Sequence, residues 1–464
     1  MSTTTTKKKA KEFQVPHILL IILFLILFAC LLTYVAPAGT YQVDENGRVL
    51  AGTFEYLPNT PVSPWAALLM IQDGIINAGS VIAMMLVAGG AIATVISTGA
   101  FEEILNFGVY KLEDKSVTVL VPSIVVMMSL LGAFAGGDSM IAFVTVGIVI
   151  CRRLRLDRIT AMAMFYLGYL IGQGASFTSN MVMIFQTTAG VAPLSGMGVR
   201  MVIWVIFTTV NAIYCTRYAL RISRDPSKSL CGEILEPEEG MAHQTEVTSF
   251  PVRAVIVAVV MILAYVLYAF GNQTYGWGQQ YLLSIMLLNA IFSAVVYRIP
   301  ANKVSKTFMQ GAQSMGGICL VMGCARVIGF VLTDGNVIHT IAYGASNIIG
   351  NFGLAAAGVG IFVFTTLINF AIPSGLSKAA IIIPVLTPIG DVCGLTRQIV
   401  AFAYQMGDSL TNTLTPVSGP LTGALGLAGV DYTKWVRYSA PLMGILAVIA
   451  GIFIAVLSAM GWVG

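Results

Sequence analysis

The stretch FAGGDSM, residues 134–140, places an aspartate between two long apolar runs. The run before it covers residues 117–135 and the run after it residues 140–151, and each is apolar enough to enter a bilayer. A lone charge at bilayer depth costs on the order of 2.5–3.5 kcal/mol on insertion scales, so Asp138 needs a partner or a function. The paired glycines before it let the backbone turn or approach a ligand closely.

The composition is that of an integral membrane protein. Of 464 residues, 57% are hydrophobic and 10% charged, well outside the range of soluble domains. A hydrocarbon core about 30 Å thick needs about 20 apolar residues per helix, and we expect an all-α polytopic membrane protein with about ten transmembrane helices. Two candidate spans, residues 158–194 and 397–430, are broken in the middle. The uninterrupted ones cover residues 16–37, 80–98, 198–220, 252–270, 281–298, 316–333 and 438–460.

The sequence offers little material for enzymatic chemistry. His17, His243 and His339 lie far apart, and the 7 cysteines form no CxxC pair. No Walker loop and no nucleophile with a nearby base is visible. We therefore expect no enzyme, no cofactor other than a coupling ion such as Na⁺, and no nucleic-acid partner. The net charge of +4 mainly reflects membrane topology.

The positive-inside rule orients the chain with residues 1–15 as an uncleaved cytoplasmic segment and the C-terminus outside. The runs around FAGGDSM then begin after Lys115 and end at Arg152, both on the inside, so they cannot both cross. A re-entrant hairpin over residues 117–151 is predicted, entering from the cytoplasm. A second interrupted pair, residues 353–390, has no basic residue at either end and is predicted to enter from outside. This orientation places most lysines and arginines on the cytoplasmic side. The exceptions are Arg48, Arg200 and Arg397, which fall outside, and Arg326 and Lys378, which fall at membrane depth.

The two halves of the chain align with each other. Gly137 of FAGG matches Gly375 of FAIPSG at an offset of 238, and Gly168 matches Gly407 at an offset of 239. Each half contains a hairpin followed by a broken helix and makes four crossings, so it ends on the side of the membrane where it began. An inverted second copy must start on the opposite side, which requires one extra helix between the halves. The predicted units are a first repeat at 16–220, a cytoplasmic loop at 221–251, a linking helix at 252–270 and an inverted second repeat at 281–464. Inverted repeats with discontinuous helices are typical of secondary transporters.

Four polar regions converge near the midplane if this symmetry holds: the hairpin tips at 134–140 and 372–378, and the breaks at 172–180 and 406–416. Their glycines, hydroxyls and amides suit Na⁺ and close approach of a ligand, and half-helix N-termini suit a carboxylate. An anionic substrate held by Lys378 is one interpretation, with Asp138 or Asp408 taking a proton or helping to hold Na⁺. The alternative is structural pairing of Asp138 with Lys378. We expect a structural role for Arg326, which lies outside these regions.

Several motifs resemble a known family. They are KEFQVPH (residues 11–17), PAGTY (37–41), FAGGDSMIAF, SFTSN (176–180), IPSGLSKAAIIIPVLTP (372–388) and GDSLTNTLTPVSGPL (407–421), and they resemble those of the YfcC/DcuC-type carriers of the ion transporter superfamily. The resemblance covers nearly the whole chain. It implies an INDY-like elevator fold, a homodimer, and transport of C4-dicarboxylates or basic amino acids across the inner membrane. The family tip commonly carries two adjacent acids, whereas only Asp138 stands here, which favours an anion or a zwitterion.

The resemblance also implies the site residues. The substrate would contact Asp138, Ser139, Asn180, Ser374, Gly375, Ser377, Lys378, Asn412 and Thr413, and a coupling ion would contact Asp138, Ser179, Asn180, Asp408, Thr411 and Asn412, with Na⁺ at Asn180 and Asn412. The expected function is a secondary active transporter of a small carboxylate or an amino acid, coupled to Na⁺ or H⁺ or working by exchange. A basic amino acid antiporter of the same fold is the alternative, and an ion channel a more remote one.

Overall fold

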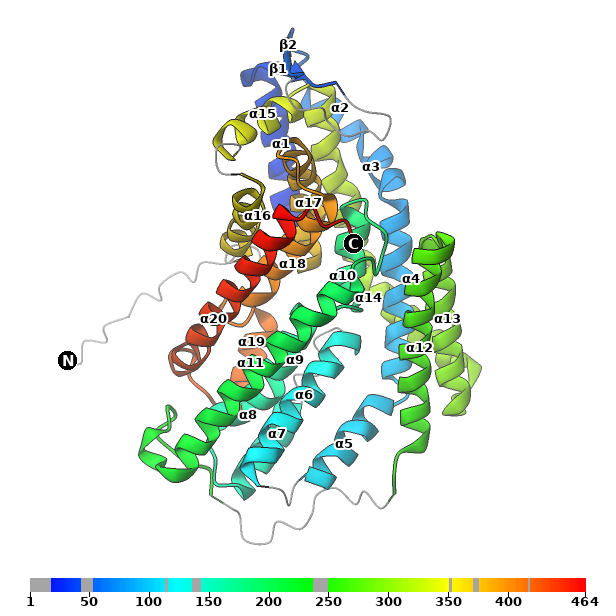
Figure 1. Ribbon diagram of the computed structural model, residues 1–464. Helices are drawn as coiled ribbons and strands as arrows, with labels where there is room; N and C mark the ends of the chain where they lie inside the picture. The colour runs from blue at the N-terminus through cyan, green and yellow to red at the C-terminus, as the bar shows by residue number, and fades with distance from the viewer. Residues whose placement is uncertain are drawn as a thin grey trace, which may run out of the picture.

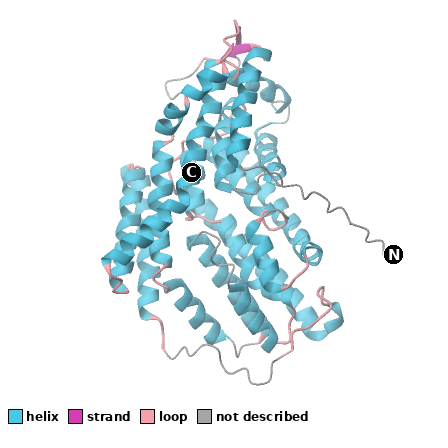
Figure 2. Ribbon diagram, turned by 180° about the vertical axis from the view of Figure 1, so that it is seen from behind, coloured by secondary structure: helices cyan, strands magenta, loops and turns pink. Residues whose placement is uncertain are grey.

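A computed structural model of the chain describes residues 18–42, 53–112, 116–135, 143–236, 249–349, 353–369, 375–415 and 418–464. These residues are mostly helical, as Figures 1 and 2 show. Two short strands, β1 (Ala38–Thr40) and β2 (Glu55–Leu57), pair antiparallel at one end of the molecule (Figure 2).

The helices of the first half run from the N-terminus to the loop predicted at residues 221–251. In chain order they are α1 (Ile18–Val35), α2 (Pro64–Leu69), α3 (Ile71–Asn77), α4 (Gly79–Ile96), α5 (Ala100–Leu112), α6 (Val117–Ala135), α7 (Val144–Arg153), α8 (Arg158–Met162), a π-helical turn (Ala163–Leu167), α9 (Gly168–Gly174), α10 (Asn180–Thr188), α11 (Met197–Arg224) and a 3₁₀ turn (Pro226–Lys228).

The second half begins after the loop. Its helices are α12 (Val252–Tyr275), α13 (Gln279–Val296), α14 (Ala301–Asp334), α15 (Ile338–Ile349), α16 (Gly353–Asn369), α17 (Gly375–Val392), α18 (Arg397–Thr411), α19 (Gly419–Ala428) and α20 (Tyr432–Ala459).

Among the described residues, 7 helices are long and apolar enough to cross a membrane. They are α4, α6, α11, α12, α13, α14 and α20, and all but α6 coincide with predicted uninterrupted spans. α6 belongs to the predicted first hairpin, and its apolar window Val117–Phe134 has the length of a full crossing. Exposed apolar side chains recur along α12, for example Val259, Leu263 and Val266, as lipid contact requires. The chain is therefore a multi-pass membrane protein.

One predicted boundary was wrong. The span at residues 316–333 is the second part of α14, which begins at Ala301 and has 34 residues. Lys303 and Lys306, which precede the predicted span, lie in its first turns. The helix continues through them because Pro300 precedes its first residue and no proline follows until the helix has ended.

The helices pack in two groups. In the first, α1, α3 and α4 pack on α14, α4 also packs on α13, and α12 packs on α13 and α5. In the second, α6 packs on α9 and α11, while α16 packs on α18 and α20, and α9 meets α18 in the middle. Figure 1 shows α12 and α13 at one side of the molecule and α16, α18 and α20 at the other. Contacts of α10 with α4, of α5 with α6 and of α14 with α17 join the groups.

Side-chain caps mark the start of both broken helices and the restart of the first. Asp157 caps α8, its side chain accepting the Thr160 N–H at 2.9 Å, and Thr396 caps α18 in the same way. After the first break, at residues 175–179, Ser179 caps α10 by accepting the Val182 N–H. Ser418 precedes α19 but makes no side-chain cap hydrogen bond. Because capping satisfies N–H groups that have no partner inside the helix, Asp157, Ser179 and Thr396 fix where their half-helices begin.

The second break lies later than predicted. The stretch expected to be irregular was 406–416, but residues 406–411 are helical and the helix ends at Thr411. The hydroxyls of Ser409 and Thr411 donate to carbonyl oxygens four residues earlier, those of Gln405 and Gly407. Serine and threonine bonded in this way are compatible with a helix, which is why a polar run did not mark the break.

Features of the two broken helices recur at one spacing. Arg158 and Arg397 are 239 residues apart, as are Gly190 and Gly429. The Arg158 guanidinium donates to the carbonyl of Ala428 at 3.1 Å, beside Gly429, which has φ +63°. The Arg397 guanidinium in turn lies beside Gly190, which has φ +74°. The arginine at the start of each broken helix thus contacts the backbone at the end of the other broken helix.

Glycines bring the broken helices into backbone contact with α6 and α16. A Cβ on Gly172 of α9 would lie 2.0 Å from the carbonyl oxygen of Ser129 in α6. A Cβ on Gly407 of α18 would lie 2.8 Å from the carbonyl oxygen of Phe362 in α16. Neither obstacle is a flexible side chain, so a larger residue would have to push two helices apart.

Replacing Gly172 by alanine is therefore expected to lower stability. The extra methyl overpacks a helix contact, at a cost of about 1–3 kcal/mol. Thermal unfolding of the detergent-solubilised protein measures the change. Gly444→Ala is the matched control, because Gly444 lies inside α20 with open space where its Cβ would be. The control should be neutral or slightly stabilising. Equal effects of both variants would contradict the close approach.

Candidate functional site

A small pocket lies where the two broken helices meet. Asp408 is the charged residue among those that line it. The others come from α9, α10 and α18 and from the break after α18: Leu170, Gln173, Gly174, Met181, Val182, Phe185, Gln405, Ser409 and Asn412. The lining thus combines an apolar side with amides, a hydroxyl and one carboxylate, as in a site for a small polar ligand.

A buried ion pair lies at this pocket. The Lys378 Nζ is 2.8 Å from Asp408 Oδ1, and the two side chains are 0% and 4% exposed. Lys378 belongs to the first turn of α17 and Asp408 to the last turn of α18. The partner considered from the sequence was Asp138, which lies outside the described residues. Asp408 is thus the carboxylate that the structure brings to this lysine.

Asn369, the last residue of α16, joins the ion pair to the break after α18. Its Oδ1 accepts from Lys378 Nζ at 2.5 Å. Its Nδ2 lies within hydrogen-bond distance of three acceptors: the Asp408 carbonyl at 2.9 Å, Thr411 Oγ1 at 2.7 Å and Asn412 Oδ1 at 2.8 Å. Asn369 is not among the site residues predicted from the sequence. The available signal was a carboxamide in the apolar run that precedes the second tip.

The start of α17 closes over the carboxylate. A Cβ on Gly375, the first residue of this helix, would lie 2.6 Å from Asp408 Oδ2, so a larger residue would push the carboxylate aside. Tyr404 donates its hydroxyl to the Gly375 carbonyl at 2.7 Å, and its ring centroid lies 5.5 Å from the Lys378 Nζ. The positive end of the helix dipole and the lysine therefore both face Asp408. Gly375 and Lys378, two predicted site residues, meet here.

Gln405 connects α18 to the first break. Its Nε2 donates to the carbonyls of Gly174 and Ser176, each at 2.9 Å. Its Oε1 accepts from the guanidinium of Arg200, which rests over the Phe402 ring at 5.3 Å. The sequence placed Arg200 outside, at the start of the span predicted at 198–220. Arg200 lies in the first turn of α11 and is 1% exposed, because Gln405 and Phe402 hold its side chain inside the bundle.

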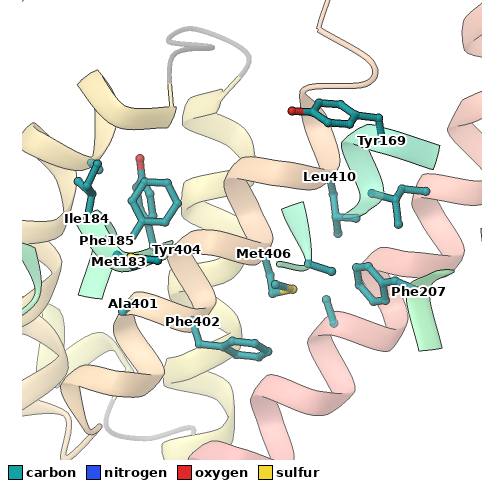
Figure 3. Close-up of a cluster of buried hydrophobic side chains, with 14 of the residues drawn as sticks. Tyr169, Met183, Ile184, Phe185, Phe207, Ala401, Phe402, Tyr404, Met406 and Leu410 are labelled. Atoms are coloured by element: carbon teal, nitrogen blue, oxygen red, sulfur yellow. The ribbon is translucent and has the colours of Figure 1, made fainter. Parts of the chain in front are cut away.

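The apolar layer beside the pocket comes from α10 and α18. Phe185 and Tyr404 pack edge to face with ring centroids 4.9 Å apart, and Figure 3 shows them side by side. Met406 lies on the same helix as Tyr404 and is fully buried. This packing keeps the Lys378–Asp408 pair away from bulk water on that side, which strengthens the electrostatic attraction between them.

Other predicted site residues have different positions. Asn180 begins α10, and its buried Oδ1 has no hydrogen-bond partner among the residues described. Ser179 is buried as the cap of α10, so its hydroxyl already has a backbone partner. Thr413 is buried and donates to the Leu410 carbonyl. Asn412 lines the pocket. Asp138, Ser139 and Ser374 lie outside the described residues, as does the side chain of Ser377.

No group of three or more histidine, cysteine, aspartate or glutamate side chains arranged for a metal occurs in the described part of the chain. Arg326 lies in α14 and does not line the pocket between the breaks. Its structural role stays a prediction.

Comparison with known proteins assigns the chain to a family. Residues 15–459 match the DcuC family of C4-dicarboxylate anaerobic carriers. The chain belongs to this family. A protein of Escherichia coli (strain K12), YfcC, whose name proposes a basic amino acid antiporter, is 27% identical over 100% of both chains. The resemblance to YfcC/DcuC-type carriers is thereby confirmed.

Two solved structures share the fold of this DcuC family member. The YdaH transporter of Alcanivorax borkumensis matches with a TM-score of 0.75 at 16% identity, over 97% of this chain and 99% of that one. MtrF of Neisseria gonorrhoeae, from a class of antimetabolite efflux pumps, matches with a TM-score of 0.73 at 15% identity, over 97% and 96%. Membership of the DcuC family of carriers shows that the protein is a membrane transporter.

The Lys378–Asp408 pair should show strong energetic coupling. Lys378→Met or Asp408→Asn alone leaves a buried charge unpaired and should cost about 3–5 kcal/mol. The double variant removes both charges and should cost clearly less than the sum. Thermal unfolding of all four proteins measures the cycle.

Lys228→Met is the control for this cycle. Lys228 is also 2.9 Å from a carboxylate, that of Asp225, but both side chains are more than two-fifths exposed. Little change in stability is expected there, because water screens exposed pairs. Additive effects of Lys378→Met and Asp408→Asn would mean that the buried pair contributes no more than an exposed one.

Proposed function

We propose that this protein is a secondary active transporter that moves a small carboxylate or an amino acid across the cytoplasmic membrane, coupled to Na⁺ or H⁺ or by exchange. The observation that carries the proposal is the polar pocket between the two breaks, with Asp408 in its lining and Lys378 buried behind it. Secondary transporters bind substrates where discontinuous helices meet near the membrane midplane.

The proposal includes an inverted-topology repeat, with units at 16–220 and 281–464 joined by the helix predicted at 252–270. The spacing of 239 residues between Arg158 and Arg397, and between Gly190 and Gly429, supports it. We propose re-entrant hairpins at 117–151 and 353–390, broken helices at 158–194 and 397–430, and about ten crossings in total. The N-terminus would be cytoplasmic and the C-terminus outside.

Transport would follow an elevator mechanism in a homodimer. The group formed by α6–α11 and α16–α20 contains the pocket and would move, while α1, α4, α5 and α12–α14 would form the scaffold. The division follows the packing of the helices: each group is continuous, and α10, α14 and α17 supply contacts between them. Such sliding of packed helices is a common way to switch access.

The lining of the pocket bears on the substrate class. Lys378 is fully buried and already paired, so it is not a free cation for an anionic substrate. Gln173, Ser409 and Asn412 offer neutral donors and acceptors, and Asp408 could accept from an ammonium group. A zwitterionic amino acid or a hydroxylated carboxylate fits this set. A basic amino acid antiporter is the second candidate, favoured by the carboxylate in the lining and by the name of YfcC.

Uptake by proteoliposomes tests the function. C4-dicarboxylates, neutral amino acids and basic amino acids are offered under imposed Na⁺, H⁺ or counter-substrate gradients, and at least one should accumulate. Counterflow should also occur, because a carrier exchanges its substrate. A channel would show flux without counterflow. If no gradient drives accumulation of any candidate, the proposal fails.

Asn412→Ala should raise KM for the transported substrate by about tenfold or more, because the pocket loses a hydrogen-bonding amide. The control is Asn272→Ala, since Asn272 donates to the Trp277 carbonyl near the end of α12, far from the pocket lining. Initial rates of uptake over a range of substrate concentrations measure both. An unchanged KM in the Asn412 variant would remove this residue from the substrate site.

A further inference from the structure

The ammonium group of Lys378 lies among oxygen atoms of the kind that bind alkali cations in proteins. Its Nζ is 2.8 Å from the Asp408 carboxylate and 2.5 Å from the Asn369 amide oxygen, with the side chain 0% exposed. The Tyr404 ring, 5.5 Å away, adds a negative face. A carboxylate and an amide oxygen converging on one buried point are hard ligands that would also suit a metal cation.

We propose that Lys378 is a built-in cation that replaces Na⁺ at Asp408. The proposal rests on the transport function above and concerns its coupling: Na⁺ does not bind at Asp408, because the lysine of the same chain already occupies that point. It replaces the expectation that Asp408, Thr411 and Asn412 together hold Na⁺.

The remaining oxygens of that expected set have partners of their own. Thr411 Oγ1 lies 2.7 Å and Asn412 Oδ1 2.8 Å from the Nδ2 of Asn369. The Asn369 amide is in turn held by Lys378 at its oxygen. A Na⁺ ion bound here would have to turn this amide around and displace the lysine at the same time.

Moving Lys378 away from Asp408 would cost free energy, because the ammonium would remain inside the bundle. The ammonium is fully buried, and Asp408 is the carboxylate that the described residues place beside it. An ammonium pushed away from this partner would be left charged and unpaired in a low-dielectric interior, which is strongly unfavourable. A cation from solution also loses its own hydration on entry, whereas the lysine is held there by the chain. Na⁺ therefore competes poorly at this point.

Among the described residues, the charged network is formed by the second half of the chain. At the offset of 238, Lys378 corresponds to Met140 and Asn369 to Leu131, and at 239 Asp408 corresponds to Tyr169. The first half therefore has no lysine, carboxamide or carboxylate at the matching positions. Asn180, with its unpartnered Oδ1, is a separate candidate for Na⁺ and is not part of this network.

The experiment measures Na⁺ binding directly and needs no substrate. Wild type, Lys378→Met, Lys378→Met/Asp408→Asn and the exposed control Lys228→Met are compared in isotonic NaCl and isotonic choline chloride. Thermal unfolding and equilibrium binding of radioactive ²²Na⁺ are the readouts. Removing the lysine leaves Asp408 with a vacant cation position, so Lys378→Met should gain Na⁺ binding and a rise in Tm of a few degrees with Na⁺.

The other proteins set the baseline. The double variant has no carboxylate to compensate and should match wild type and Lys228→Met in its response to Na⁺. Any Na⁺ bound at Asn180 would appear equally in all four proteins and cancel in the comparison. If Lys378→Met is too unstable to purify in choline chloride, it should be recovered when NaCl is present throughout.

Two results would overturn the proposal. One is wild-type Na⁺ binding that disappears in an Asp408→Asn variant. The other is a Lys378→Met protein that gains no Na⁺ binding, or that folds in neither salt while the double variant folds in both. Failure of the transport function would look different, since it would leave this pattern of Na⁺ binding intact while no candidate substrate accumulates.

Discussion

The contact between Lys378 and Asp408 is the interaction on which the centre of this protein depends. Both charges are removed from water, so each needs the other, and Asn369 completes the arrangement by accepting from the lysine and donating toward the break. The pair joins the first turn of α17 to the last turn of α18, and α16 is drawn in through Asn369. A single buried charge pair thereby fixes three helices at the point where the pocket forms.

Close backbone contacts make this geometry accessible. Gly375 allows α17 to begin against the Asp408 carboxylate, while Gly172 and Gly407 let the broken helices approach α6 and α16. Gln405 then ties α18 to the carbonyls of Gly174 and Ser176 at the other break. Irregular backbone inside a membrane protein is tolerated when its polar groups find such partners or line a cavity. The pocket thus forms where the polar backbone groups at both breaks find hydrogen-bond partners.

Membership of the DcuC family of carriers and the fold shared with YdaH and MtrF agree with this architecture. The fold alone does not select a substrate, because related scaffolds carry different cargo. Selection would depend on the side chains that face the pocket, where one carboxylate stands among neutral amides and a hydroxyl. The buried ammonium of Lys378 already balances the Asp408 carboxylate, so the substrate does not need to supply that positive charge.

The sequence by itself determined the membrane class, the positions of most long helices and the first break, because hydropathy, caps and glycines act locally along the chain. It also indicated that Lys378 and Asp408 lie at membrane depth. Only the tertiary structure decided that these two residues pair, that Asn369 joins them and that Arg200 is buried against Gln405. Such contacts link residues up to 205 positions apart. They depend on how helices are rotated and spaced in the bundle, which no local pattern encodes.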